Sequence, residues 1–389
     1  MSAAKVIQTL NSFDPANCKD ELERVELISA ARSLLAKATT PFEFVHDITH
    51  STPMLTVGIK LAHDAQLFEK WQKQGGGAKT TKQLASLIGA DPPFLHRYLV
   101  HMVACNVLEQ VDENTFKQTH LSEGLTVPTL VAWVDYLYEF LLPLQLGWPE
   151  YLKKNGLKEP PHSRDGLFQD VFKCPGKTLF NYLEEKPEAG DMFNTCMTGW
   201  GGHRMGWLDF YPTEQLIDKK TDTPILVDVG GNVGHDLEKF LAKHPGTASR
   251  LVLEDLPEVI ERATCDKKIK RVKHNFFDPQ PIKGARAYYL KTVLHDWSDE
   301  HAVKILRSLK PGLVPGYSKI LINDVVIKAT DPDWKTTGED LAVMMVVGSL
   351  ERPEIRWNRL ITEAGLSVVK IASHPAALES IIEVELLAN

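Results

Sequence analysis

The 389-residue sequence lacks the cysteine pattern of a disulfide-stabilised or zinc-binding protein. Its five cysteines are scattered and odd in number, and none forms a Cys-x-x-Cys pair. This pattern predicts reduced thiols in a cytoplasmic protein, with neither a disulfide framework nor a zinc site. The N-terminus also lacks a basic segment followed by an apolar one, so we expect no secretory signal.

An uninterrupted apolar run and an excess of positive charge are missing as well. The most apolar stretch, Thr126 to Leu146, contains two prolines and two carboxylates, so we expect a buried helix there and no membrane span. The net charge of −7 argues against nonspecific binding of nucleic acid or of an anionic membrane. The length favours more than one domain.

The chain is organised around a strand followed by a glycine turn. Apart from Asp228, residues Ile225 to Val229 are apolar and mostly β-branched, which predicts a buried strand, and Gly230 and Gly231 follow directly. Apolar residues then recur at helical spacing from Leu237 to Leu241. Strand, glycine turn and helix are typical of the first part of a nucleotide-binding βαβ unit.

The residues of this turn narrow the choice of nucleotide. A dinucleotide site needs glycine at the third and sixth positions, where this chain has Asn232 and His235. No Gly-Lys-Ser/Thr follows, which excludes a P-loop. Asp228 precedes the turn, and the next predicted strand ends in Glu254 and Asp255, where a carboxylate typically binds ribose hydroxyls. The pattern favours a nucleoside without a pyrophosphate.

Three motifs in the same order give the chain a family resemblance. Val227 to Gly234, Leu253 to Ile260 and Val293 to His301 resemble the S-adenosylmethionine-dependent O-methyltransferases of the plant caffeate type and their fungal branch, which includes methyltransferase-like pericyclases. The resemblance covers about residues 40 to 389. It implies an α/β fold, in which a Rossmann-like class I methyltransferase domain follows a mainly α winged-helix dimerisation domain.

We therefore expect three segments. Residues 1–120 are expected to form the helical, winged-helix dimerisation domain, 121–220 a helical connector that contributes to the substrate pocket, and 221–389 the Rossmann-like catalytic domain that binds S-adenosylmethionine. The winged-helix prediction rests on two helical patterns, 80–88 and 94–105, followed by a hairpin around Asp112. A DNA reader is the alternative, but the module lacks a basic surface. Residues 1–40 could be a dimer arm or an ordinary packing helix.

The resemblance assigns donor binding to residues near the ends of successive strands. Neighbouring strand residues point to opposite sides, so Asp255 is the expected ribose ligand and Glu254 its less favoured rival. Asn232 replaces a family glycine but tolerates positive φ, whereas Asn275 stands where many relatives have aspartate. The expected donor-binding residues are Asp228, Gly230, Gly231, Asp255, Asn275, Phe276 and Lys291.

The motif Leu294 to Trp297 supplies the catalytic candidate. Its match with the family makes His295 the expected general base, with Asp324 and Glu351 as the two acids that flank it. Asp324 is shorter than the usual glutamate, so its reach to His295 is open; the alternative for both acids is solvated surface carboxylates. A metal site is not expected, because Ser298 is placed to cap the helix that follows.

The acceptor pocket is less well defined by the sequence. Met197, Trp200 and His203 lie near the places where the family lines its pocket, although a core methionine and a partly exposed histidine are equally compatible with the pattern. The function expected is O-methylation of a phenolic or enolic small molecule of secondary metabolism by a homodimer, with no nucleic-acid or membrane partner. The alternative is a pericyclase or dehydratase that binds the donor without using its methyl group, on a polyketide-derived substrate.

Overall fold

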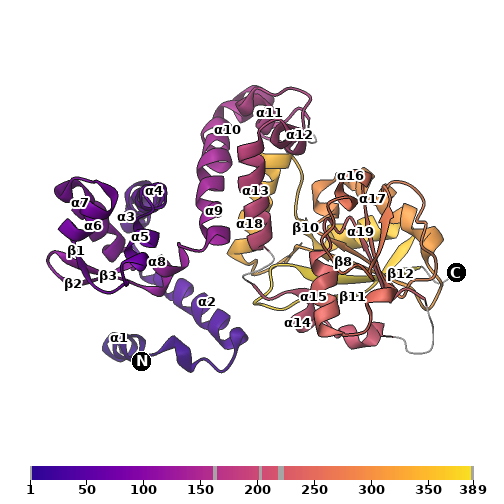
Figure 1. The fold of residues 1–389 in the computed structure, drawn as a ribbon, viewed down its shortest axis with the longest axis horizontal. Helices are drawn as coiled ribbons and strands as arrows, with labels where there is room; N and C mark the ends of the chain where they lie inside the picture. The colour runs from indigo at the N-terminus through magenta and orange to yellow at the C-terminus, as the bar shows by residue number, and fades with distance from the viewer. Residues whose placement is uncertain (1, 161–163, 201–203, 218–222, 387–389) are drawn as a thin grey trace. The chain divides into compact units, whose positions relative to one another are not determined.

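The computed structural model describes residues 2–160, 164–200, 204–217 and 223–386 (Figure 1). The chain forms two compact units, Met1–Pro143 with Leu183–His203, and Leu144–Tyr182 with Arg204–Asn389. The predicted segments 1–120, 121–220 and 221–389 were defined by their expected roles and not by compactness, and that division stays a prediction. Within the described ranges, no helix combines the length and apolar character that a membrane span needs, and no disulfide joins the cysteines.

The first unit is mainly helical. It opens with α1 (Ala3–Ser12), α2 (Glu21–Ala38) and α3 (Pro41–His46), and the side chain of Asp20 caps α2 by accepting from the amide of Glu23. The next helices, α4 (Thr52–Asp64) and α5 (Leu67–Lys73), are separated because Gln66 adopts a left-handed φ of 56°. None of α1, α2 and α3 contains a buried residue.

The two predicted helices and the hairpin of residues 80–118 are present. A three-stranded sheet in the order β1-β3-β2 packs with the two helices around Leu99 and Phe116, both 0% exposed. The elements are β1 (Lys79–Thr80), α6 (Thr81–Ile88), α7 (Pro92–Ala104), β2 (Leu108–Asp112) and β3 (Thr115–Gln118).

Longer helices follow this module. After α8 (His120–Gly124), α9 (Pro128–Tyr136) continues through a π-helical turn, Leu137–Leu141, into α10 (Leu142–Asn155). In the first unit α9 packs against α13 (Pro187–Trp200). A Cβ on Gly199 would lie 2.3 Å from the carbonyl oxygen of Thr129, so glycine permits this close helix packing. The other helices of residues 160–210 are α11 (Leu167–Phe172), α12 (Leu179–Glu184) and α14 (Trp207–Phe210).

A seven-stranded sheet forms the centre of the second unit, in the order β11-β12-β8-β7-β4-β5-β6. Among these described strands, β12 pairs antiparallel with both β11 and β8, and the other pairs are parallel. Figure 1 shows helices on both faces. The strands are β4 (Leu226–Val229), β5 (Leu251–Asp255), β6 (Lys270–Lys273), β7 (Ala287–Lys291), β8 (Lys319–Asp324), β11 (Leu366–Ala372) and β12 (Ser380–Leu386).

Alternate residues of the strands divide the core into two hydrophobic clusters. Val227 and Tyr288 pack on one face with α17 (Asp299–Leu309) and α19 (Glu354–Glu363). Leu226 and Tyr289 pack on the other face with α15 (His235–Lys243). Because side chains of a strand alternate between faces, near-continuous apolar strands are what a sheet covered on both sides requires.

This topology gathers the candidate residues at one edge. Strand β4 lies between β5 and β7, so the chain leaves it in opposite directions, and ligands bind such sheets at the carboxyl ends of the strands beside this switch point. Asp255, Lys291 and Asp324 are the last residues of β5, β7 and β8, and Asp228 is the penultimate residue of β4. The sheet therefore places four predicted side chains along one edge.

Several elements of the second unit were not predicted. Strand β6 carries Lys-Arg-Val-Lys, a polar sequence that suits an edge strand but shows no apolar pattern. The helices α18 (Trp334–Val347) and α19 were also missed. Two short strands pair in parallel: β9 (Val326–Ile327) precedes α18, and β10 (Arg352–Pro353) lies between α18 and α19 in the chain. The omission of α18 and β10 matters because both lie beside the catalytic candidates.

Candidate active site

The glycine turn is closely packed against its own strand. Gly230 has a φ of 74°, and a Cβ on Gly231 would lie 2.5 Å from the carboxyl carbon of Asp228. Asn232 has a φ of 54°, so asparagine does take the left-handed conformation here. Its amide donates to Asp255 Oδ2 at 2.8 Å, which connects the turn to the end of β5. The backbone of the turn is thus held in a cradle that side chains at Gly230 and Gly231 would fill.

The two acids at the end of β5 lie in different environments. Glu254 is 1% exposed and accepts from Gln280 Nε2 at 2.8 Å, and burial raises the pKa of this carboxyl to about 7. Asp255 is half-buried and also accepts from the amide of Leu256 at 2.7 Å. Since each carboxylate oxygen can accept a further bond, Asp255 has capacity left for ribose hydroxyls. The geometry favours Asp255 over its rival.

An ion pair that the sequence did not reveal lies beside the turn. Lys291 Nζ is 2.9 Å from Asp236 Oδ2, and Asp236 stands in the first turn of α15. Asp228 is 2% exposed and its Oδ2 has no hydrogen-bond partner among the described residues. Burial, and secondly the charge of Asp236, raises the pKa of Asp228 well above its usual value. A cation that contacts Asp228, such as the ammonium group of S-adenosylmethionine, would compensate this buried acid.

The loop after β6 touches both the glycine turn and the catalytic motif. A ring carbon of Phe276 would lie 3.7 Å from a Cβ on Gly230, and its ring meets that of Trp297 edge-on with centroids 5.9 Å apart. Asn275 Oδ1 accepts from the amide of Phe277 at 3.1 Å. Asn275 therefore stabilises its own loop, and its side-chain NH2 group is still available to hydrogen-bond a nucleobase.

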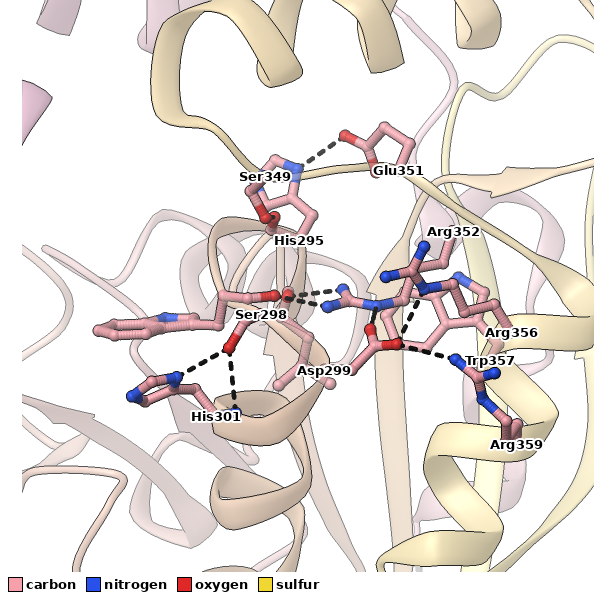
Figure 2. A network of polar contacts seen from close by, with 12 residues as sticks. His295, Ser298, Asp299, His301, Ser349, Glu351, Arg352, Arg356, Trp357 and Arg359 are labelled. Carbon is pink, nitrogen blue, oxygen red and sulfur yellow. Dashed lines mark hydrogen bonds and ion pairs between the residues drawn. The ribbon is translucent and has the colours of Figure 1, made fainter. Parts of the chain in front are cut away.

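His295 follows β7 on a short 3-10 turn, Leu294–Asp296, and is fixed by a carboxylate. Its Nδ1 lies 2.7 Å from Glu351 Oε1, and the Glu351 side chain is 1% exposed (Figure 2). The other ring nitrogen, Nε2, is 3.6 Å from Asp296 Oδ1. With Nδ1 engaged by Glu351, Nε2 is the nitrogen through which His295 can exchange a proton with a substrate.

Several negative charges surround this imidazole. Burial lowers the pKa of His295, but the charges of Asp296, Glu351 and Asp324 and the Glu351 hydrogen bond outweigh burial, so the pKa lies well above its usual value. Burial also raises the pKa of Asp296. The site combines one strengthened base with carboxyl groups that resist ionisation.

Asp324 lies close to the pair without joining it. It is 0% exposed, and neither carboxyl oxygen has a hydrogen-bond partner among the described residues. His295, Asp324 and Glu351 each place one ligand-type atom within 4.8 Å of the others, a grouping that could hold a cation. Burial raises the pKa of Asp324 to about 8.

Other polar residues near the base were missed by the sequence analysis. Glu339 on α18 is half-buried, and burial, then repulsion by Glu351, raises its pKa to about 7. Ser349 donates from Oγ to the carbonyl oxygen of His295, and Arg352 bonds to the same loop. Arg352 directly follows the predicted acid Glu351, and this position could have pointed to it as a second functional residue. Glu339 gave no signal, because α18 itself was not expected.

The predicted acceptor-pocket residues belong to the first unit. Met197 lies on α13 with 40% of its surface exposed, which argues against a core methionine. Trp200 is the last residue of α13, and His203 lies outside the described residues. The role of all three in a pocket stays a prediction.

Known proteins resemble the chain over its whole length. The O-methyltransferase domain family matches residues 161–367. The chain is 41% identical to O-methyltransferase mfmE of Annulohypoxylon moriforme, with 98% of this chain and 95% of that protein covered. It is 34% identical to O-methyltransferase mpaG of Penicillium roqueforti, with 93% of each chain covered. These findings confirm the predicted fungal relationship.

Solved structures agree with the fold. The structure of LepI in complex with SAM (S-adenosylmethionine) superposes with a TM-score of 0.88 at 26% identity, covering 99% of this chain and all of that one. A structure described as a pericyclic reaction enzyme gives 0.87 at 26% identity, covering 98% of this chain and 99% of that one. The predicted α/β fold with a Rossmann-like domain is confirmed, as is its class of cofactor. The chain belongs to the S-adenosylmethionine-dependent O-methyltransferase family.

Proposed function

We propose that this enzyme transfers a methyl group to a phenolic or enolic hydroxyl of a secondary metabolite, with His295 as the general base. The observation that carries the proposal is the 2.7 Å contact between His295 Nδ1 and the buried Glu351. A carboxylate in this position fixes the imidazole tautomer and stabilises the imidazolium that forms when Nε2 takes a proton. When bound, S-adenosylmethionine supplies an electrophilic methyl group.

The charge around His295 suits a phenol as the proton donor. An ordinary histidine, with a pKa of about 6.5, differs from a phenol at about 10 by roughly 3.5 units, or ~5 kcal/mol. The raised pKa of His295 narrows that difference, so proton transfer costs less free energy. The same shift moves the deprotonation of His295 to a pH above its ordinary value, so activity should rise with pH over a range that lies above about 6.5.

Donor binding is assigned to the edge of the sheet beside β4. Asp255 would hold the ribose, Gly230 and Gly231 would let the backbone approach the methionine part, and Asp228 would face its ammonium group. Asn275 and Phe276 would flank adenine, and Lys291, which pairs with Asp236, would also contact the donor. The remaining assignments rest on the family: Asp324 as a second acid behind the base, with Met197, Trp200 and His203 as pocket residues. A cytoplasmic location is supported by the scattered cysteines.

A pericyclase or dehydratase that binds the donor without using it is the second candidate. It is favoured by the likeness to the pericyclic reaction enzyme at 26% identity. The His295–Glu351 pair favours methyl transfer over a pericyclic step, because a pericyclic step removes no proton and does not need an imidazole held in one tautomer. The two reactions differ in product mass, since only transfer adds a methyl group.

Incubation with S-adenosylmethionine and a panel of hydroxylated aromatics and enols tests the proposal. We expect S-adenosylhomocysteine and a product heavier by one methyl group. His295→Gln should lower kcat by about 10²- to 10⁴-fold, the usual contribution of a positioned base, with donor Kd within about twofold. Isomerised or dehydrated substrate with donor unconsumed, or full activity of His295→Gln, would contradict the proposal.

The glycine turn provides a test of the donor site alone. Gly231→Ala would bring a Cβ to 2.5 Å from the Asp228 carboxyl carbon, so either the turn or Asp228 must move. We expect donor Kd, measured by calorimetry, to increase at least about tenfold, because the loss of one charge-assisted contact costs ~1.5–3 kcal/mol. Gly206→Ala is the control, since its Cβ would meet only Asp209 Oδ2 at 3.9 Å. Equal donor affinity in both variants would argue against this assignment.

A homodimer is supported by the N-terminal helices. Apolar side chains of α1, α2 and α3 remain in water, among them Leu10 (49% exposed), Leu35 (67%) and Phe42 (77%). Folded proteins gain about 25 cal/mol for each Å² of apolar surface removed from water, which favours covering these helices with a partner. A second copy is the simplest partner, because twofold homodimers are the commonest soluble oligomers. We assign this contact to the segment 1–120.

Sedimentation velocity tests the dimer. The double variant Leu35→Glu with Phe42→Glu should sediment as a monomer, since charges in an apolar interface remain unpaired. Lys37→Glu, an exposed charge change on the same helix, should leave the dimer intact. A wild-type monomer at micromolar concentration, or a dimer that survives the double substitution, would refute the assignment.

A further inference from the structure

A buried arginine holds the loop that carries the base. We call residues Leu294–Asp299 the base loop. The Arg352 side chain is 0% exposed, and its Nη1 and Nη2 donate to the carbonyl oxygens of Leu294 and Trp297 at 2.8 and 2.5 Å. Its Nε donates to Asp299 Oδ1 at 2.8 Å (Figure 2). All three guanidinium nitrogens therefore bind the base loop, at its beginning, middle and end.

The neighbours of Arg352 contact the same loop. Ser349 Oγ donates to the carbonyl oxygen of His295, and Glu351 binds the His295 ring. The segment Ser349–Arg352 is anchored in turn: the amide of Glu351 donates to Asp340 Oδ1 at 2.8 Å, and Arg352 pairs with Val326 between β10 and β9. The base and its carboxylate thus sit on two segments that are joined mainly through Arg352.

Arginine suits this place for a geometric reason. Its planar fork holds donors in fixed directions, so one side chain can bind two carbonyls and a carboxylate at once, whereas lysine is a point charge. The guanidinium carbon also lies 5.2 Å from the centroid of the Trp357 ring, and Trp357 donates to the carbonyl of Val325. The Trp357 ring therefore also helps to hold the Arg352 guanidinium in position.

We propose that Arg352 is a positioning residue, which holds the base loop so that His295 Nδ1 stays in register with Glu351. The inference rests on the proposed role of His295 as base and adds a requirement to it. Without the fork, the loop would lose both carbonyl anchors, and only the Ser349 bond and the His295–Glu351 contact itself would hold it to this segment. A displacement of about 1 Å at a reacting group can lower a rate by about 100-fold.

The shared partner Asp299 supplies a matched control. Arg359 Nη2 lies 3.2 Å from Asp299 Oδ2, but the Arg359 side chain is 71% exposed, and among the described residues it is Arg352 that bonds to the loop carbonyls (Figure 2). Arg352→Lys and Arg359→Lys each retain positive charge near Asp299. Only the first removes the fork from the backbone of the base loop.

The test compares kcat, donor Kd, Tm and the pH dependence of kcat in the full-length enzyme. For Arg352→Lys we expect kcat to fall by about 10- to 100-fold, with donor Kd within about twofold of wild type. The rise of kcat with pH should move to lower pH, because a histidine displaced from Glu351 titrates nearer to about 6.5. Arg359→Lys should match wild type in all four measurements.

A purely structural role predicts a different result. It would lower Tm while the folded Arg352→Lys enzyme kept the wild-type kcat and pH profile, and that outcome would overturn the inference. If Arg352→Lys does not fold, Ser349→Ala decides: loss of one hydrogen bond to the loop should lower kcat about fivefold and shift the profile the same way. An unchanged Ser349→Ala profile would then overturn it. Failure of wild type to transfer methyl groups would instead contradict the proposed function.

Discussion

The hydrogen bond between His295 and Glu351 is the contact on which the site depends. It joins residues 56 positions apart, one on the loop after β7 and the other just before α19. Glu351 is almost fully buried, and its Oε1 faces the imidazole at 2.7 Å. The sheet, the helices that cover it and the Arg352 anchor all serve to keep these two side chains in contact.

The acids near this pair set its chemistry. Three of them, Asp296, Asp324 and Glu339, have a raised pKa, chiefly because burial disfavours their charged forms. The charges of Asp296, Glu351 and Asp324 and the Glu351 hydrogen bond make His295 a stronger base than an ordinary imidazole. The raised pKa also means that His295 gives up its proton, and so becomes able to act as a base, only at a higher pH than an ordinary histidine. Such a balance suits an acceptor that is itself weakly acidic, as phenols and enols are.

Local patterns were sufficient to predict much of the second unit. The strand of Ile225 to Val229 and the glycine turn after it follow from an apolar run and turn residues. The edge strand β6 was not predicted because most of its residues are charged. The helix α18 was not predicted because its apolar residues are not gathered on one face. Partners such as Asp236 for Lys291 and Arg352 for the base loop depend on tertiary contacts, which residue spacing does not encode.

The state of His295 can be measured directly. ¹⁵N-histidine NMR, with the signal assigned by its loss in His295→Gln, gives the pKa of this imidazole in the wild type and in Glu351→Gln. We predict a wild-type pKa well above about 6.5 and a clear fall in Glu351→Gln, because the substitution removes the carboxylate charge from Nδ1. A wild-type His295 that titrates at or below the ordinary value, or that does not respond to Glu351→Gln, would contradict this account of the site.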